Sequence, residues 1–136
     1  MTQDTQESAS QFYPFLRYAD ARTAVDWLCD AFGFERHVVF DEPDGSLVHA
    51  ELRFGNGVVM LGQSREDALN LRTPRELGAV TGGVYAYVSD ADAHHAHAAA
   101  AGAEIVHPLR QTDYGSREYT CRDPEGNLWS FGTYRP

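Results

Sequence analysis

The amino-acid sequence predicts an α+β fold made of two copies of one βαβββ module. The first half contains Tyr18-Ala19-Asp20-Ala21 and Met60-Leu61-Gly62. The second half repeats them, about seventy residues later, as Val88-Ser89-Asp90-Ala91 and Ser130-Phe131-Gly132. Each half also shows the same order of hydrophobic patterns, namely a strand, a helix and three strands. One half alone is too small to close a hydrophobic core, so we expect the two halves to pack together.

The first module is expected over residues 12–62. It opens with a strand at residues 12–18, and a helix follows at residues 20–32. Asp20 can cap the start of this helix, and Gly33 ends it. A Pro-Asp-Gly sequence and an Asn-Gly pair, both typical of turns, separate the remaining strands. These strands are expected at residues 35–41, 47–54 and 58–61.

A charged connection without strand alternation is expected over residues 63–81, with a short helix near residues 65–70. The second module, residues 82–134, then repeats the first. Asp90 can cap a helix that runs to Ala101 and ends before Gly102. The strands of this module are expected at residues 84–88, 103–107, 118–122 and 128–134.

The first eleven residues are polar, so residues 1–11 are expected to form a flexible tail and residues 12–136 a single domain. The tail lacks the basic and apolar stretches of a signal peptide. No apolar run approaches the ~20 residues that a membrane span requires. Cys29 and Cys121 lie in apolar patterns and are interpreted as buried, reduced thiols. We therefore expect a cytoplasmic protein.

The charge of the chain argues against some classes of partner. Eleven basic residues, all of them arginine, stand against twenty acidic ones, which gives a net charge of -9. Nucleic acids and anionic membranes require clustered positive charge, so neither is an expected partner. The same acidity favours the attraction of a cationic small molecule.

Four short motifs carry a resemblance to a known family. The first module contains Phe15-Leu16-Arg17-Tyr18 and Asp30-Ala31-Phe32-Gly33-Phe34, and the second contains Tyr114-Gly115-Ser116-Arg117-Glu118 and Asp123-Pro124-Glu125-Gly126-Asn127. In this order and spacing they resemble the vicinal oxygen chelate superfamily. Its members include glyoxalase I, extradiol dioxygenases, fosfomycin-resistance enzymes and bleomycin-resistance proteins. The resemblance covers residues 12–134 and implies a curled mixed sheet around a cavity, in a homodimer.

In the metal-dependent members of this superfamily, four inward-facing side chains, usually His, Gln or Glu, bind one divalent ion. The resemblance places these positions at Tyr13, Met60, Gly83 and Ser130. This set cannot hold a divalent cation at ordinary pH, because it offers, in that order, a phenol, a thioether, no side chain and a neutral hydroxyl. The resemblance therefore implies the bleomycin-resistance-like branch without the metal ligands, and neither a metal nor another cofactor is expected.

The strand alternation set by these four positions predicts which side chains line the cavity. The predicted ligand-binding residues in the strands are Tyr13, Phe15, Met60, Tyr85, Tyr87, Leu128 and Ser130. Arg117 is expected in a loop near the cavity mouth, as a polar contact. Trp129 and Phe131 have the opposite alternation and are expected to pack under the helices. Aromatic walls suit a flat, partly apolar ligand, although the same side chains can also simply fill the cavity.

A second candidate site lies on the strand at residues 47–54, where His49 and Glu51 share one face. If this face lines the cavity, the two side chains can act as a proton-transfer pair, in which the carboxylate orients the imidazole. If it faces solvent, they form only a polar strand surface. The histidines of the second helix are expected on its solvated side: His94, His95 and His97.

Three functions are compatible with these observations. The leading hypothesis is a metal-independent protein that binds a small molecule without catalysis, such as an aromatic or cationic antibiotic that it sequesters. The alternative is a glyoxalase-like lyase or isomerase that uses His49 and Glu51, or a metal site not inherited from the family. The third is an accessory protein with a filled cavity, whose dimer surface is its only interaction site.

Overall fold

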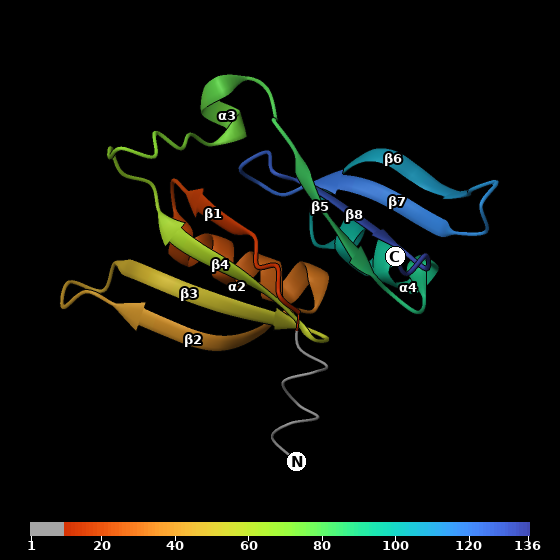
Figure 1. Cartoon of the computed structure of the whole chain (residues 1–136), viewed down its shortest axis with the longest axis horizontal. Helices are drawn as coiled ribbons and strands as arrows, with labels where there is room; N and C mark the ends of the chain where they lie inside the picture. The colour runs from red at the N-terminus through yellow and green to blue at the C-terminus, as the bar shows by residue number, and fades with distance from the viewer. Residues whose placement is uncertain (1–9) are drawn as a thin grey trace, which may run out of the picture. The chain divides into compact units, whose positions relative to one another are not determined.

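The computed structural model describes residues 10–136, so most of the predicted tail lies outside the described residues. The chain divides into two compact units. The first runs to Cys29 and then from Gly33 to Leu71, and the second contains Asp30–Phe32 and Arg72–Pro136. Each unit holds one four-stranded mixed sheet, which confirms the predicted α+β fold of two βαβββ modules (Figure 1). A single domain over residues 12–136 stays a prediction.

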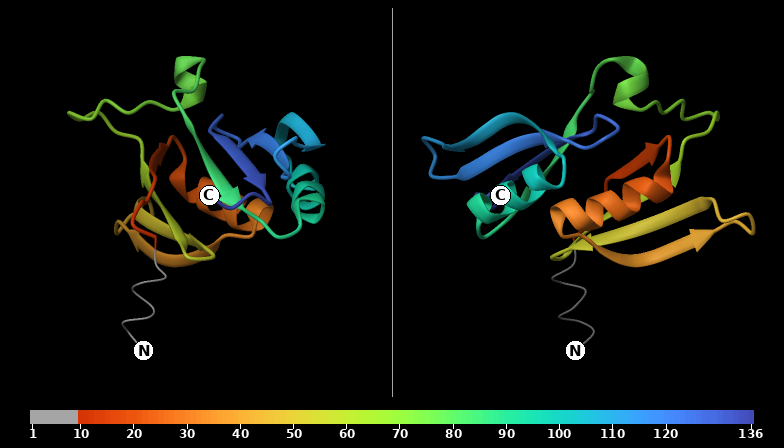
Figure 2. Two further views of the ribbon diagram at one scale, coloured as in Figure 1. Left: turned by 45° about the vertical axis from the view of Figure 1, so that its right-hand side comes forward. Right: turned by 180° about the vertical axis from the view of Figure 1, so that it is seen from behind.

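The first sheet has the strand order β1-β4-β3-β2, in which β1 and β4 are parallel and the other pairs antiparallel. The helix α2 covers one face of this sheet (Figure 2). The elements in chain order are β1 (Phe15–Tyr18), α2 (Ala21–Phe32), β2 (Glu35–Asp41), β3 (Leu47–Phe54) and β4 (Gly57–Gln63).

The second sheet repeats this topology as β5-β8-β7-β6, with β5 and β8 parallel. The helix α4 packs on β6, β7 and β8. The elements are α3 (Pro74–Leu77), β5 (Gly83–Tyr87), α4 (Ala91–Ala100), β6 (Glu104–Gln111), β7 (Arg117–Arg122) and β8 (Leu128–Gly132). Over residues 10–136, no helix has both the length and the apolar character needed to cross a bilayer.

Equivalent aspartates start the two long helices. The Asp20 carboxylate accepts a hydrogen bond from the Thr23 amide at 3.2 Å, and the Asp90 carboxylate accepts one from the Ala93 amide at 3.0 Å. Their φ angles are -129° and -131°. Both caps satisfy amides that have no partner inside the helix, as predicted. Gly33, with φ 80°, ends α2 in the left-handed conformation that glycine adopts without strain.

Strand alternation separates the core from the opposite sheet faces. Val59 and Leu61 of β4 are buried, and so are Trp129 and Phe131 of β8. The ring of Phe32 lies 4.7 Å from the ring of Phe131 and 5.5 Å from that of Trp129. The prediction that Trp129 and Phe131 form core is therefore confirmed. Residues of the other alternation point away from the helices, and they include most of the predicted ligand-binding residues.

The helix predicted at residues 65–70 does not form. The Asp67 carboxylate accepts a hydrogen bond from the Leu69 amide at 3.1 Å, and Asn70 has a positive φ of 54°, so this stretch is a turn. The connection forms its helix later, as α3. Thr73 and Glu76 make a reciprocal capping box there, with Pro74 at the start of the helix.

The two cysteines differ in burial. Cys121 has no exposed surface, as predicted, and burial raises the pKa of its thiol to about 12. Cys29 is only half-buried, because it lies at the edge of the apolar face of α2 rather than within it. Neither forms a disulfide, as predicted.

Candidate functional site

In the first unit, the candidate residues lie on the sheet face that points away from α2, here called face A. Cross-strand pairing places Phe15, Met60 and Glu51 in one row and Arg17, Gly62 and His49 in the next. Paired residues share a face, so the register brings the predicted aromatic residue and the predicted proton-transfer pair onto one surface.

The aromatic side chains of face A are unusually exposed. Phe15 is 56% exposed and Phe40 is 59% exposed. Tyr13, which precedes β1, is 41% exposed, and its hydroxyl donates a hydrogen bond to the Ser10 carbonyl. Large apolar side chains in a soluble domain are normally buried, and a group of exposed ones marks an interaction surface.

His49 and Glu51 form a direct contact on face A. The imidazole Nε2 lies 3.0 Å from Glu51 Oε2, and both side chains are about one-third exposed. The Phe40 ring stacks near the imidazole, at 6.4 Å between centroids. A carboxylate that holds one imidazole nitrogen leaves the other free to exchange a proton with a bound molecule. The arrangement is therefore competent for general acid–base chemistry.

The connection after β4 is anchored to face A by a bidentate ion pair. Arg17 Nη1 lies 3.0 Å from Asp67 Oδ1, and Nη2 lies 2.8 Å from Oδ2. The Arg17 side chain is only 8% exposed. Its hydrogen bonds lower the pKa of the Asp67 carboxyl to about 2, so the pair stays ionised throughout the physiological range.

In the second unit, the candidate residues lie on the sheet face that points away from α4, here called face B. One cross-strand row joins Tyr85, Ser130 and Thr120, and the hydroxyl oxygens of Ser130 and Thr120 are 2.7 Å apart. A parallel row contains Gly83 and half-buried Leu128. The predicted alternation of Tyr85, Leu128 and Ser130 is confirmed, while ligand contact by these residues stays a prediction.

Tyrosines gather at the far end of face B, around Glu118. Tyr114 donates a hydrogen bond to the Glu118 carboxylate at 2.8 Å, which raises the pKa of the Tyr114 phenol. Tyr85 donates one to the Tyr134 carbonyl at 2.6 Å, and burial raises its pKa. A Cβ on Gly132 would lie 2.7 Å from both Glu118 Cβ and the Tyr85 hydroxyl oxygen. Glycine is thus what allows these two side chains to meet.

Arg117 does not lie in a loop at the edge of a cavity. It is the first residue of β7, and its alternation is that of buried Tyr119, on the α4 side of the sheet. Its guanidinium Nε lies 2.9 Å from Asp92 Oδ1 on α4. Arg117 therefore points to the opposite side of the sheet from the predicted ligand-binding residues of face B. The strand begins one residue earlier than predicted because Arg117 pairs with Gln111 of β6.

His94 does not lie on the solvated side of α4. Its Nε2 lies 2.9 Å from the Phe32 carbonyl, which can only accept, so this nitrogen carries the proton. Nδ1 then accepts from the Tyr119 hydroxyl at 2.6 Å, and burial lowers the pKa of the imidazole. His97 is exposed, with Nε2 2.6 Å from the Asp30 carbonyl. The sequence of α4 did not reveal this position. The groups that cover the His94 ring come from α2, β7 and β8, and not from the alanine-rich helix itself.

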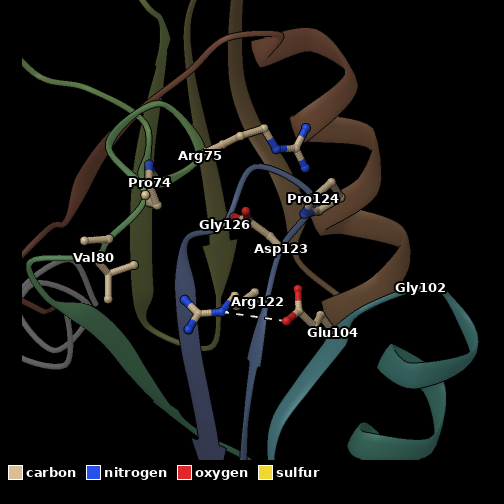
Figure 3. Close-up of a pocket in the computed structure, with 11 residues that line it drawn as sticks. Pro74, Arg75, Val80, Gly102, Glu104, Arg122, Asp123, Pro124 and Gly126 are labelled. Atoms are coloured by element: carbon tan, nitrogen blue, oxygen red, sulfur yellow. Dashed lines mark ion pairs between the residues drawn. The ribbon is translucent and has the colours of Figure 1, made fainter.

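A pocket that sequence analysis did not predict lies in the second unit, between α3 and the turn before β8 (Figure 3). It has a volume of about 480 Å³, and its charged lining includes Arg75, Glu104 and Arg122. Arg122 Nε is 4.0 Å from Glu104 Oε2. A Cβ on Gly126 would lie 3.1 Å from Pro74 Cβ, so glycine permits α3 to approach the turn. The capping-box residues Thr73 and Glu76 could have predicted α3 from the sequence. No sequence pattern predicts which turn α3 contacts.

The residues at the four positions that the family resemblance assigns to a metal do not fit a divalent ion. The Tyr13 hydroxyl donates to a carbonyl, and the Ser130 hydroxyl is paired with Thr120. Met60 offers only a thioether, and a Cβ on Gly83 would lie 2.9 Å from the Leu128 carbonyl oxygen. Among residues 10–136, no three His, Cys, Asp or Glu side chains gather closely enough to share an ion.

Comparisons with known proteins agree with this architecture. The model of the Glyoxalase/Bleomycin resistance protein/Dioxygenase superfamily matches residues 10–131. An uncharacterized protein of Mycobacterium tuberculosis is 34% identical over 121 residues, which are 88% of this chain and 71% of that protein. The crystal structure of TioX from Micromonospora sp. ML1 is 37% identical, with a TM-score of 0.72, and the match covers 93% of this chain and 98% of TioX.

A further solved structure holds a ligand. The bleomycin-binding protein from bleomycin-producing Streptomyces verticillus, in complex with copper(II)-bleomycin, superposes with a TM-score of 0.64. It is 23% identical to this chain, and the match covers 91% of this chain and 95% of that protein. At this level of identity the likeness shows a shared fold.

Proposed function

Because this chain belongs to the Glyoxalase/Bleomycin resistance protein/Dioxygenase superfamily, we propose that it binds a small aromatic molecule without a metal and without catalysis. The proposal includes capture of an aromatic or cationic antibiotic by a cytoplasmic homodimer. The observation that carries it is the exposure of aromatic rings on the sheet faces away from the helices, with Phe15 56% and Tyr87 37% exposed. Stacking on such rings is worth about 0.5–1.5 kcal/mol per pair beyond the area buried.

The charge of the chain supports a ligand with positive charge. The net charge of -9 raises the local concentration of cations, and Glu118 adds a carboxylate on face B itself. The Streptomyces verticillus protein has the same fold and binds copper(II)-bleomycin. Copper(II)-bleomycin is therefore a suitable first ligand to test. The donor chemistry of Tyr13, Met60, Gly83 and Ser130 supports binding without a protein-bound metal.

Replacing Tyr85 or Tyr87 with alanine is expected to weaken ligand binding at least tenfold. Each change removes one ring surface from face B, and tenfold corresponds to about 1.4 kcal/mol. Isothermal titration of copper(II)-bleomycin, and of a panel of aromatic cations, into the protein measures this loss. Phe12→Ala serves as a control, because it removes an exposed ring that lies outside the strands of both faces. Unchanged affinity in both variants would refute the assignment of the binding surface.

A second function is favoured by one observation, the 3.0 Å contact between His49 Nε2 and Glu51 Oε2 on face A. We infer that this pair could move a proton in a glyoxalase-like isomerisation. Incubation of chelator-treated protein with the hemithioacetal of methylglyoxal and glutathione tests it directly. Turnover that falls at least a hundredfold in both His49→Gln and Glu51→Gln, consistent with the usual contribution of general acid–base groups, would establish this function. No turnover in the unmodified protein would exclude it for this substrate.

A further inference from the structure

The C-terminal end of the chain places a cation on an aromatic ring of face B. The Arg135 guanidinium carbon lies 3.9 Å from the centroid of the Tyr87 ring. This distance and position over the ring are those of a cation–π interaction, in which the negative ring face attracts positive charge. The ring itself remains 37% exposed, so its contact with Arg135 is at the surface.

The surroundings of Tyr87 favour a cation. Tyr87, Gly132 and Glu118 form one cross-strand row on face B. Glu118 Oε2 lies 3.1 Å from the place where a Gly132 Cβ would stand, and the Tyr85 hydroxyl oxygen lies 2.7 Å from it. The other oxygen, Oε1, accepts from Tyr114 and lies 3.5 Å from Arg110 Nη2, so Oε2 is the carboxylate oxygen that a cation bound in this row would meet. Ring and carboxylate together are the chemistry that recognises an ammonium or guanidinium group.

The segment that carries Arg135 is fixed up to the preceding residue. The Thr133 amide donates to the Arg117 carbonyl at 3.2 Å, and the Tyr134 amide donates to the Ser116 hydroxyl at 3.1 Å. The Tyr134 carbonyl accepts from the Tyr85 hydroxyl at 2.6 Å. These bonds bring the chain to the edge of face B, and the contact with Tyr87 is then made by the long, flexible Arg135 side chain alone.

We propose that the ring of Tyr87, with Glu118 beside it, is a subsite for the cationic group of the ligand, and that Arg135 is a built-in competitor for it. The inference rests on the proposed function, because it names the part of the ligand that this part of face B receives. A ligand that brings an ammonium group must displace the guanidinium. Since only a side chain moves, displacement leaves the hydrogen bonds of Thr133 and Tyr134 intact.

The strength of the competition follows from the exposure of the contact. Cation–π contacts at exposed sites contribute about 0.5–1 kcal/mol, which converts to a factor of about two to five in affinity. Removing the Arg135 charge is therefore expected to tighten binding of a cationic probe by about two- to fivefold. Binding of a neutral molecule with the same shape is expected to change less, because it gains little from the ring face.

The test uses choline and its neutral counterpart 3,3-dimethylbutan-1-ol as probes, with the full-length protein labelled in its tyrosine rings. The shift of the Tyr87 ring resonance is followed by NMR at tens of millimolar probe. Arg135→Gln removes the competitor, and Tyr87→Leu removes the ring face. Arg36→Gln is the matched control, because it makes the same change in net charge on β2, where Arg36 pairs with Asp26.

The expected result is a Tyr87 shift with choline that saturates at two- to fivefold lower concentration in Arg135→Gln and is unaltered in Arg36→Gln. In Tyr87→Leu, the shifts that choline induces in the neighbouring Tyr85 ring should disappear. Three results would overturn the proposal: no choline-induced shift at Tyr87, an equal response to the neutral alcohol, or an equal effect of both arginine substitutions.

The choline experiment, together with the titration of aromatic cations into Arg135→Gln, separates this inference from the proposed function. If choline binds at Tyr87 as expected but aromatic cations do not bind to the protein, the proposed function fails and the cation subsite stands. If aromatic cations bind with an affinity that Arg135→Gln does not change, the proposed function stands and the competition fails.

Discussion

Replacing Asp123 with alanine is expected to destabilise the second unit by about 3 kcal/mol, since it deprives one buried and two half-buried donors of their acceptor. The side chain is 3% exposed. Its Oδ2 accepts from the indole Nε1 of Trp129 at 3.0 Å, and its Oδ1 accepts from the Glu125 and Asn127 amides at 3.0 and 3.1 Å. Thermal or urea-induced unfolding, followed by tryptophan fluorescence, measures the change.

Two variants make this prediction specific. Asp123→Asn keeps one acceptor oxygen but turns an amide donor toward one of the three N–H groups, so about half the loss is expected. Asp113→Ala removes an exposed carboxylate from the turn before β7 and should change stability by less than about 0.5 kcal/mol. If Asp123→Ala behaved like Asp113→Ala, the carboxylate would not be what holds Trp129 and the β7–β8 turn in place.

Replacing His94 with alanine is expected to cost about 2–4 kcal/mol. The imidazole donates to the Phe32 carbonyl, accepts from Tyr119, and lies 4.2 Å from the ring of Phe131, so alanine leaves a cavity and removes both imidazole hydrogen bonds. The measurement is the free energy of unfolding by urea at pH 8, where the imidazole is neutral in both folded and unfolded chains.

The same residue predicts a dependence on pH. Burial lowers the pKa of folded His94 below its ordinary value of 6.5. Its contribution is therefore complete above pH 6.5 and is lost as the pH falls toward the folded pKa, because the unfolded chain then binds a proton that the folded chain excludes. The slope for one proton is at most about 1.4 kcal/mol per pH unit. The raised pKa values of Tyr119 and Cys121 keep both groups from titrating in this range.

His94→Gln should remove this slope, while His107→Gln should retain it, because His107 is exposed on β6. Unfolding free energies at a series of pH values between 5 and 8 compare the three proteins. Parallel curves for all three would contradict the assignment of a neutral, proton-excluding imidazole to His94.

The strands with clear turn residues at their ends could be predicted from the sequence, and β2 and β3 have the predicted bounds. Errors arose where a local signal competes with tertiary contacts. Pro108 suggested that a strand ends at residue 107, but β6 continues to Gln111. It is an edge strand with an irregular register around the proline, which such a strand tolerates. The predicted end of β8 was late: the Thr133 amide bonds Arg117 at the start of β7, and the Tyr134 amide bonds the side chain of Ser116 just before it.

The candidate site was predictable to the extent that it follows from alternation. The period of two placed Phe15, Met60 and Tyr85 on the faces away from the helices, and the pattern is clearest around Met60, where buried Val59 and Leu61 lie on either side. What lies between elements was not predictable. Two examples are the contact of Gly126 with α3 and the position of Arg135 over Tyr87. Both depend on contacts between segments that are distant in the sequence, and the residue types alone do not predict such contacts.

Gly83 also limits what can be engineered into this chain. A Cβ at this position would lie 2.9 Å from the Leu128 carbonyl oxygen of the paired strand, so any side chain here requires β5 or β8 to shift. Replacing Gly83 with histidine therefore does not supply a metal ligand on the present backbone.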